Sequence, residues 1–283
     1  MSDVHDLSDL PDVDVRLVVA DMDGTLLDAN GRVPEGLWPL LERLRERGAA
    51  FVPASGRQYA TLAALFTDHL GGMPVIAENG TYVVRDGEEL SSDGLSADIV
   101  RRIVTRMRQS SKAGRNLGVV VCGKRSAYIE RGDQPFRDEV DIYYRRLAHV
   151  EDLLDVDDQV LKIAVYDFDE VEASAAADLA DYRATHQVVV SGHHWVDVMN
   201  AGVNKGSALR RLQGQLGVTR AQTVAFGDFL NDLEMLGEAD ASFAMANAHP
   251  DIIAAAAYLA PANTDDGVVR VLGALLDRAG GAG

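Results

Sequence analysis

Two carboxylates stand two residues apart in the segment Asp21-Met-Asp23-Gly-Thr, directly after an apolar run. A carboxylate can attack phosphorus, and a second one beside it can transfer protons to and from the reacting oxygens. Asp21 is therefore the candidate nucleophile and Asp23 the candidate general acid and base. Because a carboxylate and a phosphate dianion repel each other, this chemistry requires a cation beside the pair.

The segment Gly227-Asp228-Phe-Leu-Asn231-Asp232 also follows an apolar run and supplies oxygen ligands for such a cation. Mg²⁺ takes hard oxygen ligands and usually keeps several waters. The side chains of Asp21 and Asp228, with the backbone carbonyl of Asp23, would be a sufficient share from the protein. Asp232, one helical turn beyond Asp228, could order those waters or hold a lysine.

Two further segments offer contacts for a phosphate group. Lys205 lies where a loop leads into a helix, so its ammonium and the free N–H groups of the first turn could meet phosphate oxygens. Ser55-Gly56-Arg57 follows another apolar run and offers a hydroxyl and open backbone amides. A solvated surface lysine and a serine that only caps the following helix remain the simpler alternatives.

The elements that must position these residues are short apolar runs, which predict buried parallel strands. Between the first two runs, Leu37, Leu40, Leu41 and Leu44 have helical spacing. An open α/β sheet binds its ligand beyond the carboxyl ends of its strands, so the polar residues should converge in one crevice. The predicted strands are 16–20, 49–54, 74–77, 223–226 and 241–245.

The pattern changes from about residue 85 to about residue 198. Expected helices at 97–109 and 170–185 alternate there with strand-like segments at 117–122 and 160–166, which indicates an inserted α+β domain. The predicted organisation is an acidic, flexible start at 1–14, a catalytic core at 15–85 and 199–283, and an inserted domain at 86–198.

The segments around Asp21, Ser55, Lys205 and Asp228, in this order, resemble the four motifs of the haloacid dehalogenase-like phosphatases. The long insertion, with Glu78-Asn79-Gly80 before it, is similar to the Cof-type subfamily, whose cap is a C2-type α/β module. The resemblance implies a Rossmann-like, three-layer α/β core with a parallel sheet and a cap that closes over the substrate and sets specificity.

The resemblance also implies a role for each matched residue. It makes Asp21 the nucleophile, Asp23 the acid and base, Ser55 and Lys205 phosphate contacts, Asp228 the Mg²⁺ ligand, Asn231 a phosphate or substrate contact and Asp232 a supporting carboxylate. Gly56 is a further candidate for binding the phosphate, and Arg57 and Asn79 are candidates for contacts beyond it.

Composition excludes several other classes of function. The 283 residues carry a net charge of −17, which opposes binding to nucleic acid or to an anionic membrane. The single cysteine, Cys122, cannot form an intrachain disulfide and is interpreted as part of the core. No signal-like start and no apolar run of about 18 residues is present, which predicts a soluble, cytoplasmic protein. Monomer and homodimer remain open.

The sequence therefore predicts a Mg²⁺-dependent phosphatase that acts on small metabolites. Sugar phosphates, pyridoxal phosphate, flavin mononucleotide and phosphorylated flavin precursors are the substrates that the resemblance implies. A phosphosugar mutase on the same core and a non-catalytic module that binds a phosphorylated metabolite are the alternatives. His193-His194-Trp195 could face the substrate pocket where the inserted domain returns to the core, although packed or surface histidines are the simpler interpretation.

Overall fold

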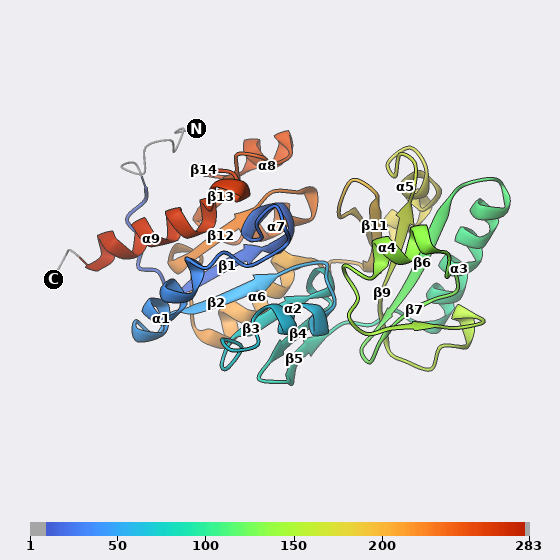
Figure 1. The fold of residues 1–283 in the computed structure, drawn as a ribbon, viewed down its shortest axis with the longest axis horizontal. Coiled ribbons are helices and arrows are strands. Elements are labelled where there is room, and N and C mark those ends of the chain that lie inside the picture. The colour runs from blue at the N-terminus through green and yellow to red at the C-terminus, as the bar shows by residue number, and fades with distance from the viewer. Residues whose placement is uncertain (1–9, 281–283) are drawn as a thin grey trace.

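The structure, a computed structural model, describes residues 10–280 and folds them into two lobes, each with its own β-sheet (Figure 1). The core sheet has eight strands in the order β14-β13-β12-β1-β2-β3-β4-β5. The first six of these are parallel, and β4 and β5 are antiparallel additions. The strands are β1 Leu17–Asp21, β2 Ala50–Ala54, β3 Pro74–Ala77, β4 Tyr82–Arg85, β5 Glu88–Ser92, β12 Thr223–Gly227, β13 Ala241–Met245 and β14 Tyr258–Ala260.

The predicted α/β fold is confirmed, but the core sheet is mixed rather than all parallel. Asp86 and Gly87 have φ values of 54° and 79° and form the two-residue turn between β4 and β5. Such Asp-Gly turns join antiparallel strands in hairpins. The core sheet therefore runs on to Ser92 and continues past the expected boundary at residue 85.

Helices cover both faces of the core sheet, which makes the three layers that the family resemblance implied. Helices α1 (Leu37–Glu46), α2 (Tyr59–Leu65) and α9 (Gly267–Gly280) pack with Val18 and Ala20 of β1. Helices α6 (Lys205–Leu216), α7 (Leu233–Leu236) and α8 (Pro250–Ala255) pack with Leu17 and Val19 on the other face. In α1 the four leucines with helical spacing are all buried.

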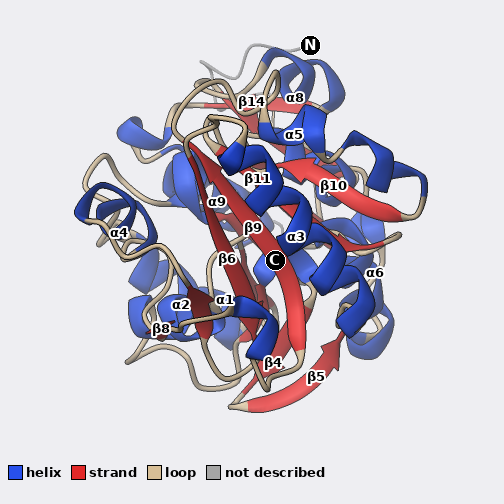
Figure 2. Cartoon of the chain, turned by 90° about the vertical axis from the view of Figure 1, so that its right-hand side faces the viewer, coloured by secondary structure: helices blue, strands red, loops and turns tan. Residues whose placement is uncertain are grey.

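The inserted lobe is built on a six-stranded sheet in the order β10-β11-β9-β6-β7-β8, with β7 and β8 the parallel pair. Figure 2 views the molecule from the side of this lobe. The strands are β6 Leu117–Gly123, β7 Ala127–Ile129, β8 Leu147–His149, β9 Val160–Asp167, β10 His186–Val190 and β11 Trp195–Asn200. The helices are α3 (Ala97–Lys112), α4 (Gln134–Val140) and α5 (Ala175–Asp178). The expected long helix at 170–185 is wrong, because α5 ends at Asp178 and a 3₁₀ turn follows at Ala180–Ala184.

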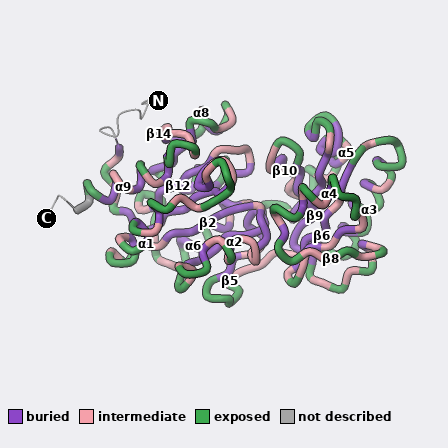
Figure 3. Tube along the Cα trace, viewed as in Figure 1, coloured by how far each residue is buried: buried purple, intermediate pink, exposed green. Residues whose placement is uncertain are grey.

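The two faces of the inserted sheet differ. Side chains alternate along a strand, so Ile163 and Val165 of β9 pack under α3 and α5 while Ala164 and Tyr166 face the other way. The second face carries Cys122, which is buried as expected. Both lobes have buried strands at their centre and exposed turns at their edges (Figure 3).

Both ends of the described chain lie on the core lobe, away from the inserted lobe (Figure 1). The expected flexible start at 1–14 falls partly outside the described residues, which begin at Leu10. Leu10 is buried in the core, and Asp14 accepts a hydrogen bond from Gln222. Residues 10–14 are thus attached to the core. Within residues 10–280 no helix is both long and apolar enough to cross a bilayer.

Candidate active site

The candidate residues follow strands that neighbour one another in the core sheet. Asp21 ends β1, Ser55 follows β2, Asn79 follows β3, and Asp228 follows β12. Because these strands are parallel and adjacent, their carboxyl ends meet at one edge of the sheet. The structure thus brings together residues that are up to about two hundred positions apart in the chain.

A tight turn after β1 lets both aspartates of the first motif reach this edge. Gly24 has a φ of 79°, and a Cβ built on it would lie 2.3 Å from Oδ2 of Asp228. A side chain at this position would therefore meet both backbone strain and a clash. Glycine is required here so that the turn can pass directly beside the carboxylate of Asp228.

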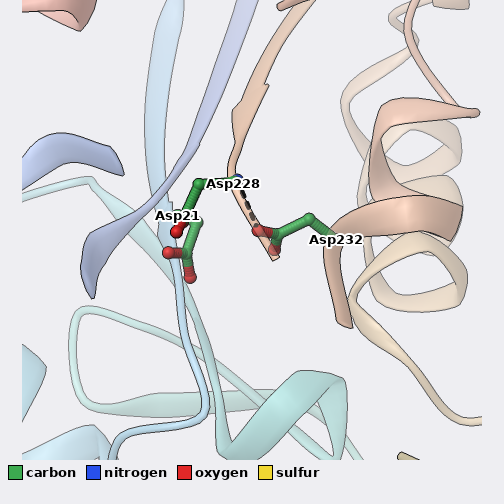
Figure 4. Close-up of side chains that lie close together, drawn as sticks. All are labelled: Asp21, Asp228 and Asp232. Atoms are coloured by element: carbon green, nitrogen blue, oxygen red, sulfur yellow. Dashed lines mark hydrogen bonds between the residues drawn. The ribbon is translucent and has the colours of Figure 1, made fainter. Parts of the chain in front are cut away.

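Three carboxylates gather at the centre of the site and could hold a metal ion. Oxygen atoms of Asp21, Asp228 and Asp232 lie within 4.8 Å of one another (Figure 4). Asp232 is already engaged, since its Oδ2 accepts hydrogen bonds from the backbone N–H groups of Asp228 at 3.0 Å and Phe229 at 3.2 Å. Thr25 donates to Oδ1 of Asp228 at 2.7 Å and orients that side chain. Asp21 and Asp228 are therefore the better-placed ligands.

Lys205 is a fully buried cation beside Asp21. Its Nζ lies 2.5 Å from Oδ1 of Asp21 and 2.7 Å from Oδ1 of Asp232. Burial opposes the charged ammonium, but the two carboxylates more than offset this effect and raise the pKa of Lys205. Lys205 is the first residue of α6, where the side chain of Asn204 caps the helix by accepting from the N–H of Ser207. Asp232 thus holds the lysine, one of the two roles considered for it.

Negative charge is in excess despite Lys205. Burial raises the pKa of Asp21 well above its usual value, and the neighbouring carboxylate of Asp232 adds to the effect. Burial, followed by repulsion from Asp232, raises the pKa of Asp228 to about 7. A divalent cation bound between these carboxylates would offset their mutual repulsion. Hard oxygen donors in an under-compensated cluster fit a divalent cation.

Asp23 has a partner that sequence reasoning missed. The guanidinium of Arg57 donates from Nε to Oδ2 of Asp23 at 2.7 Å and from Nη2 to Oδ1 at 2.5 Å. This fork fixes the carboxylate while 43% of the Asp23 side chain stays exposed. The other side of Arg57 packs over the ring of Tyr143, a residue of the inserted lobe, 5.3 Å from its centroid. Arg57 was expected to contact the substrate, and here it pairs with the candidate acid and base.

The remaining predicted contacts divide into two groups. Ser55, Gly56 and Asn231 lie on the wall of the site, and the Ser55 hydroxyl accepts from the N–H of Arg57 at 3.1 Å. Asn79 is buried and engaged at both ends, because it accepts from Asn231 at 3.0 Å and donates to the inserted lobe's Asp197. Its amide joins the two lobes instead of facing the cavity.

A cavity of about 670 Å³ lies over the site, between the two lobes. Sequence reasoning did not identify most of its wall on the inserted lobe, which includes Lys162, Tyr166 and Asp197; Trp195 was only suggested as facing the pocket. The alternation of side chains between the two faces of the strands at 162–166 and 195–199 could have identified these residues. The exposed side chains of His193 and His194 also line the cavity, where they were considered as a possibility.

Several known proteins are similar to this chain in sequence and in fold. The 5-amino-6-(5-phospho-D-ribitylamino)uracil phosphatase YbjI of Escherichia coli is 32% identical over 93% of this chain and 96% of its own. A phosphatase of the same description, YitU of Bacillus subtilis, is 25% identical over 90% and 96%. The HMP-PP phosphatase of Cronobacter sakazakii is 29% identical over 86% and 89%.

The crystal structure of SMU.1108c from Streptococcus mutans superposes with a TM-score of 0.87 at 27% identity, over 93% of this chain and 99% of that one. Residues 18–272 match the family described as haloacid dehalogenase-like hydrolase. This match covers the candidate catalytic residues, the core sheet except Leu17 and the whole inserted lobe. The chain therefore belongs to the haloacid dehalogenase-like hydrolases.

Proposed function

We propose that the protein is a Mg²⁺-dependent phosphatase of small phosphorylated metabolites that works through an aspartyl-phosphate on Asp21. The observation that carries the proposal is the position of Asp21 at the end of β1. One of its carboxylate oxygens lies 2.5 Å from Nζ of Lys205, and the carboxylate of Asp228 lies beside it. A nucleophile, a cation for the phosphate and a metal ligand thus occupy one edge of the sheet.

In the first half of the reaction the Asp21 carboxylate attacks phosphorus. The bond between phosphorus and the leaving-group oxygen breaks, and Asp23 gives that oxygen its proton. In the second half Asp23, now a carboxylate, takes a proton from a water molecule whose oxygen attacks phosphorus. The bond from phosphorus to Asp21 then breaks, which releases inorganic phosphate and restores both carboxyl groups. The fork from Arg57 binds the ionised form of Asp23, which is the form that takes the proton from water in the second half.

The phosphate would be held by the Ser55 hydroxyl, the Gly56 N–H, Lys205 and the Asn231 amide. Mg²⁺ would be held by the carboxylates of Asp21 and Asp228 and by the backbone carbonyl of Asp23. Bound there, Mg²⁺ would offset the repulsion between the Asp21 carboxylate and the phosphate dianion. Asp232 would act indirectly, through its contact with Lys205.

The inserted lobe would act as the cap that closes over the substrate. We place it at about 93–198, with the core at 15–92 and 199–283, since β5 pairs within the core sheet. A closed cap would contact the catalytic loops in two places. The ring of Tyr143 packs against Arg57, and Asp197 accepts a hydrogen bond from Asn79. Closure of this kind excludes water while phosphate is transferred to Asp21.

The first candidate substrate is 5-amino-6-(5-phospho-D-ribitylamino)uracil, since two similar proteins are described as phosphatases of this compound. Sugar phosphates, pyridoxal phosphate and flavin mononucleotide complete the panel. Release of inorganic phosphate, measured with Mg²⁺ and with a chelator, tests the proposal. Mg²⁺-dependent release supports it. Interconversion of positional isomers without release would indicate a mutase, and binding without any reaction would indicate a non-catalytic module.

A further inference from the structure

We infer that the cap side of the cavity is a subsite for a flat, uncharged ring, so that the substrate is a phosphate monoester whose leaving group carries such a ring and no second phosphate. This inference rests on the proposed phosphatase function, which places the reacting phosphate at the core side of the same cavity.

The subsite is built by two neighbouring strands of the cap. Alternation places Lys162 and Tyr166 of β9 on one face of the cap sheet, and Trp195 and Asp197 of β11 stand beside them. All four residues line the cavity. Aromatic side chains thus occupy one end of this wall, and the charged pair occupies the other.

The aromatic end of the wall is rigid. The ring of Trp195 packs edge-on against Tyr166, with centroids 5.0 Å apart, and against Tyr143, with centroids 5.5 Å apart. Burial, followed by the charge of the neighbouring Glu139, raises the pKa of Tyr166 to about 12, so its hydroxyl stays neutral. Rings fixed in this way lose little entropy when a ligand packs on them, which favours binding of a planar group.

The cavity has room for such a leaving group. Its volume of about 670 Å³ lies within the range of roughly 300–1,000 Å³ typical of small-molecule sites. A phosphate group alone fills only a small part of this space. The remainder lies between the catalytic edge of the core sheet and the aromatic wall of the cap.

The charges on the wall exclude a second phosphate. Apart from the catalytic carboxylates and the histidines, the charged side chains of the described residues that line the cavity are those of Glu139, Asp197, Arg57 and Lys162. Both cations are engaged, Arg57 by Asp23 and Lys162 by the Gly56 carbonyl and Glu78. A second phosphate would meet repulsion from the carboxylates without a free cation to offset it. The bisphosphate that a phosphosugar mutase must hold is disfavoured for the same reason.

Two matched substrate pairs test the inference. 5-Amino-6-(5-phospho-D-ribitylamino)uracil and D-ribitol 5-phosphate share the chain that carries the phosphate and differ by the ring. Stacking on an aromatic wall is typically worth about tenfold or more, so we expect kcat/KM to be at least about tenfold higher for the ring-bearing compound. Fructose 6-phosphate and fructose 1,6-bisphosphate differ by one phosphate, and we expect the bisphosphate to be the poorer substrate.

Variants of Tyr166 test whether the aromatic wall of the cap causes the preference for the ring-bearing compound. In Tyr166→Leu the ratio of kcat/KM between the ring-bearing and ring-free compounds should fall about tenfold, while Tyr166→Phe, which keeps the ring, should retain the ratio. Tyr182→Leu is the matched control, because Tyr182 lies in the same lobe and packs against His186 outside the cavity wall. If Tyr166 had only a structural role, Tyr166→Leu would lower kcat/KM for both compounds and leave their ratio unchanged.

Binding gives a readout that does not need turnover. The chain has two tryptophans, so Trp38→Phe leaves Trp195 as the single fluorescent reporter, and Asp21→Asn added to it prevents reaction. The ring-bearing compound should change this fluorescence with half-saturation at a concentration about tenfold below that of D-ribitol 5-phosphate.

The outcomes separate the inference from the proposed function. Mg²⁺-dependent phosphate release with equal kcat/KM for the two ribityl compounds, or a preference for the bisphosphate, overturns the ring subsite and leaves the phosphatase standing. No release from any compound, with the fluorescence preference present, supports the subsite and rejects the phosphatase. No fluorescence preference overturns the subsite in either case.

Discussion

Lys162 is a buried cation that connects the cap to the core, and removing its charge should lower the free energy of unfolding. The side chain comes from β9 of the cap, and its Nζ lies 2.7 Å from the carbonyl oxygen of Gly56 and 3.1 Å from Oε2 of Glu78, both in the core. Asp197 of the cap lies 3.5 Å away. The side chains of Lys162 and Glu78 are 2% and 1% exposed, so solvent does not screen the pair.

The change Lys162→Met keeps the length and apolar stem of the side chain and removes its charge. Glu78 and Asp197 then remain buried without their cation. Removing one partner of a buried ion pair typically costs about 3–5 kcal/mol. We expect a loss of that size in the free energy of unfolding at pH 8.

The loss should be smaller at pH 5, and the sign follows from Glu78. Burial raises the pKa of Glu78, and Lys162 opposes this shift. Without Lys162 the pKa in the folded state rises further above that of the unfolded chain. As the pH rises from 4.5 toward the folded pKa, the unfolded state ionises first, so the variant loses stability. Below this window the carboxyl is protonated in both states and the penalty is absent.

Urea unfolding followed by circular dichroism at pH 5 and pH 8 measures this effect. Lys124→Met is the matched control, because Lys124 of the cap pairs with Glu89 of the core at 2.7 Å in a solvent-accessible position. Exposed pairs contribute about 0–1 kcal/mol, so this variant should change little. Adding Glu78→Gln to Lys162→Met should restore part of the stability. A loss below about 1 kcal/mol at pH 8, or an equal loss at both pH values, would refute the reasoning.

Three further predictions concern the site and the cap. Asp21→Asn should lower kcat more than about a thousandfold while the circular dichroism spectrum stays unchanged, because the amide keeps the shape and lacks the nucleophilic charge; near-normal turnover would rule out the covalent intermediate. Asp228→Asn should raise the Mg²⁺ concentration needed for half-maximal phosphate release by at least about tenfold, and an unchanged requirement would remove Asp228 from the metal site. Gly118→Ala should cost about 1–3 kcal/mol of stability, since its Cβ would lie 2.0 Å from the ring of Phe136; Phe136→Leu in the same chain should recover part of that loss, and a neutral Gly118→Ala would contradict the packing described for the cap.

The sequence predicted the core well because its signals are local. The apolar run that ends at Asp21 is β1, and the four leucines spaced along 37–44 form the buried face of α1. A polar residue at the end of each parallel strand must lie at the catalytic edge, since topology brings these ends together. This topological rule was enough to predict that Asp21, Ser55 and Asp228 lie together. Their catalytic roles stay predictions until the variants are measured.

The cap contacts could not be predicted in the same way, because they join residues far apart in the chain. Arg57 was expected at the substrate, but no local pattern reveals that its fork meets Asp23 or that a cap tyrosine covers its other side. The expected helix at 170–185 shows the limit of periodicity. The Asp167 carboxylate accepts from the N–H of Ala175, the first residue of α5, and the spacing of apolar residues does not reveal this bond.

The net charge of −17 has a consequence for selectivity that only the structure makes visible. The global field repels a phosphorylated substrate, so binding depends on local positive charge. At the reacting phosphate this charge comes from Lys205, which Asp21 and Asp232 hold in place. Within the described part of the chain, Arg57 and Lys162 are the lysine and arginine side chains that line the cavity, and carboxylates bind both of them. This distribution of charge provides a cation for one phosphate and none for a second. If the proposed function holds, a site of this kind must distinguish its substrates by the uncharged part of the leaving group, which is the part that the inferred ring subsite would bind.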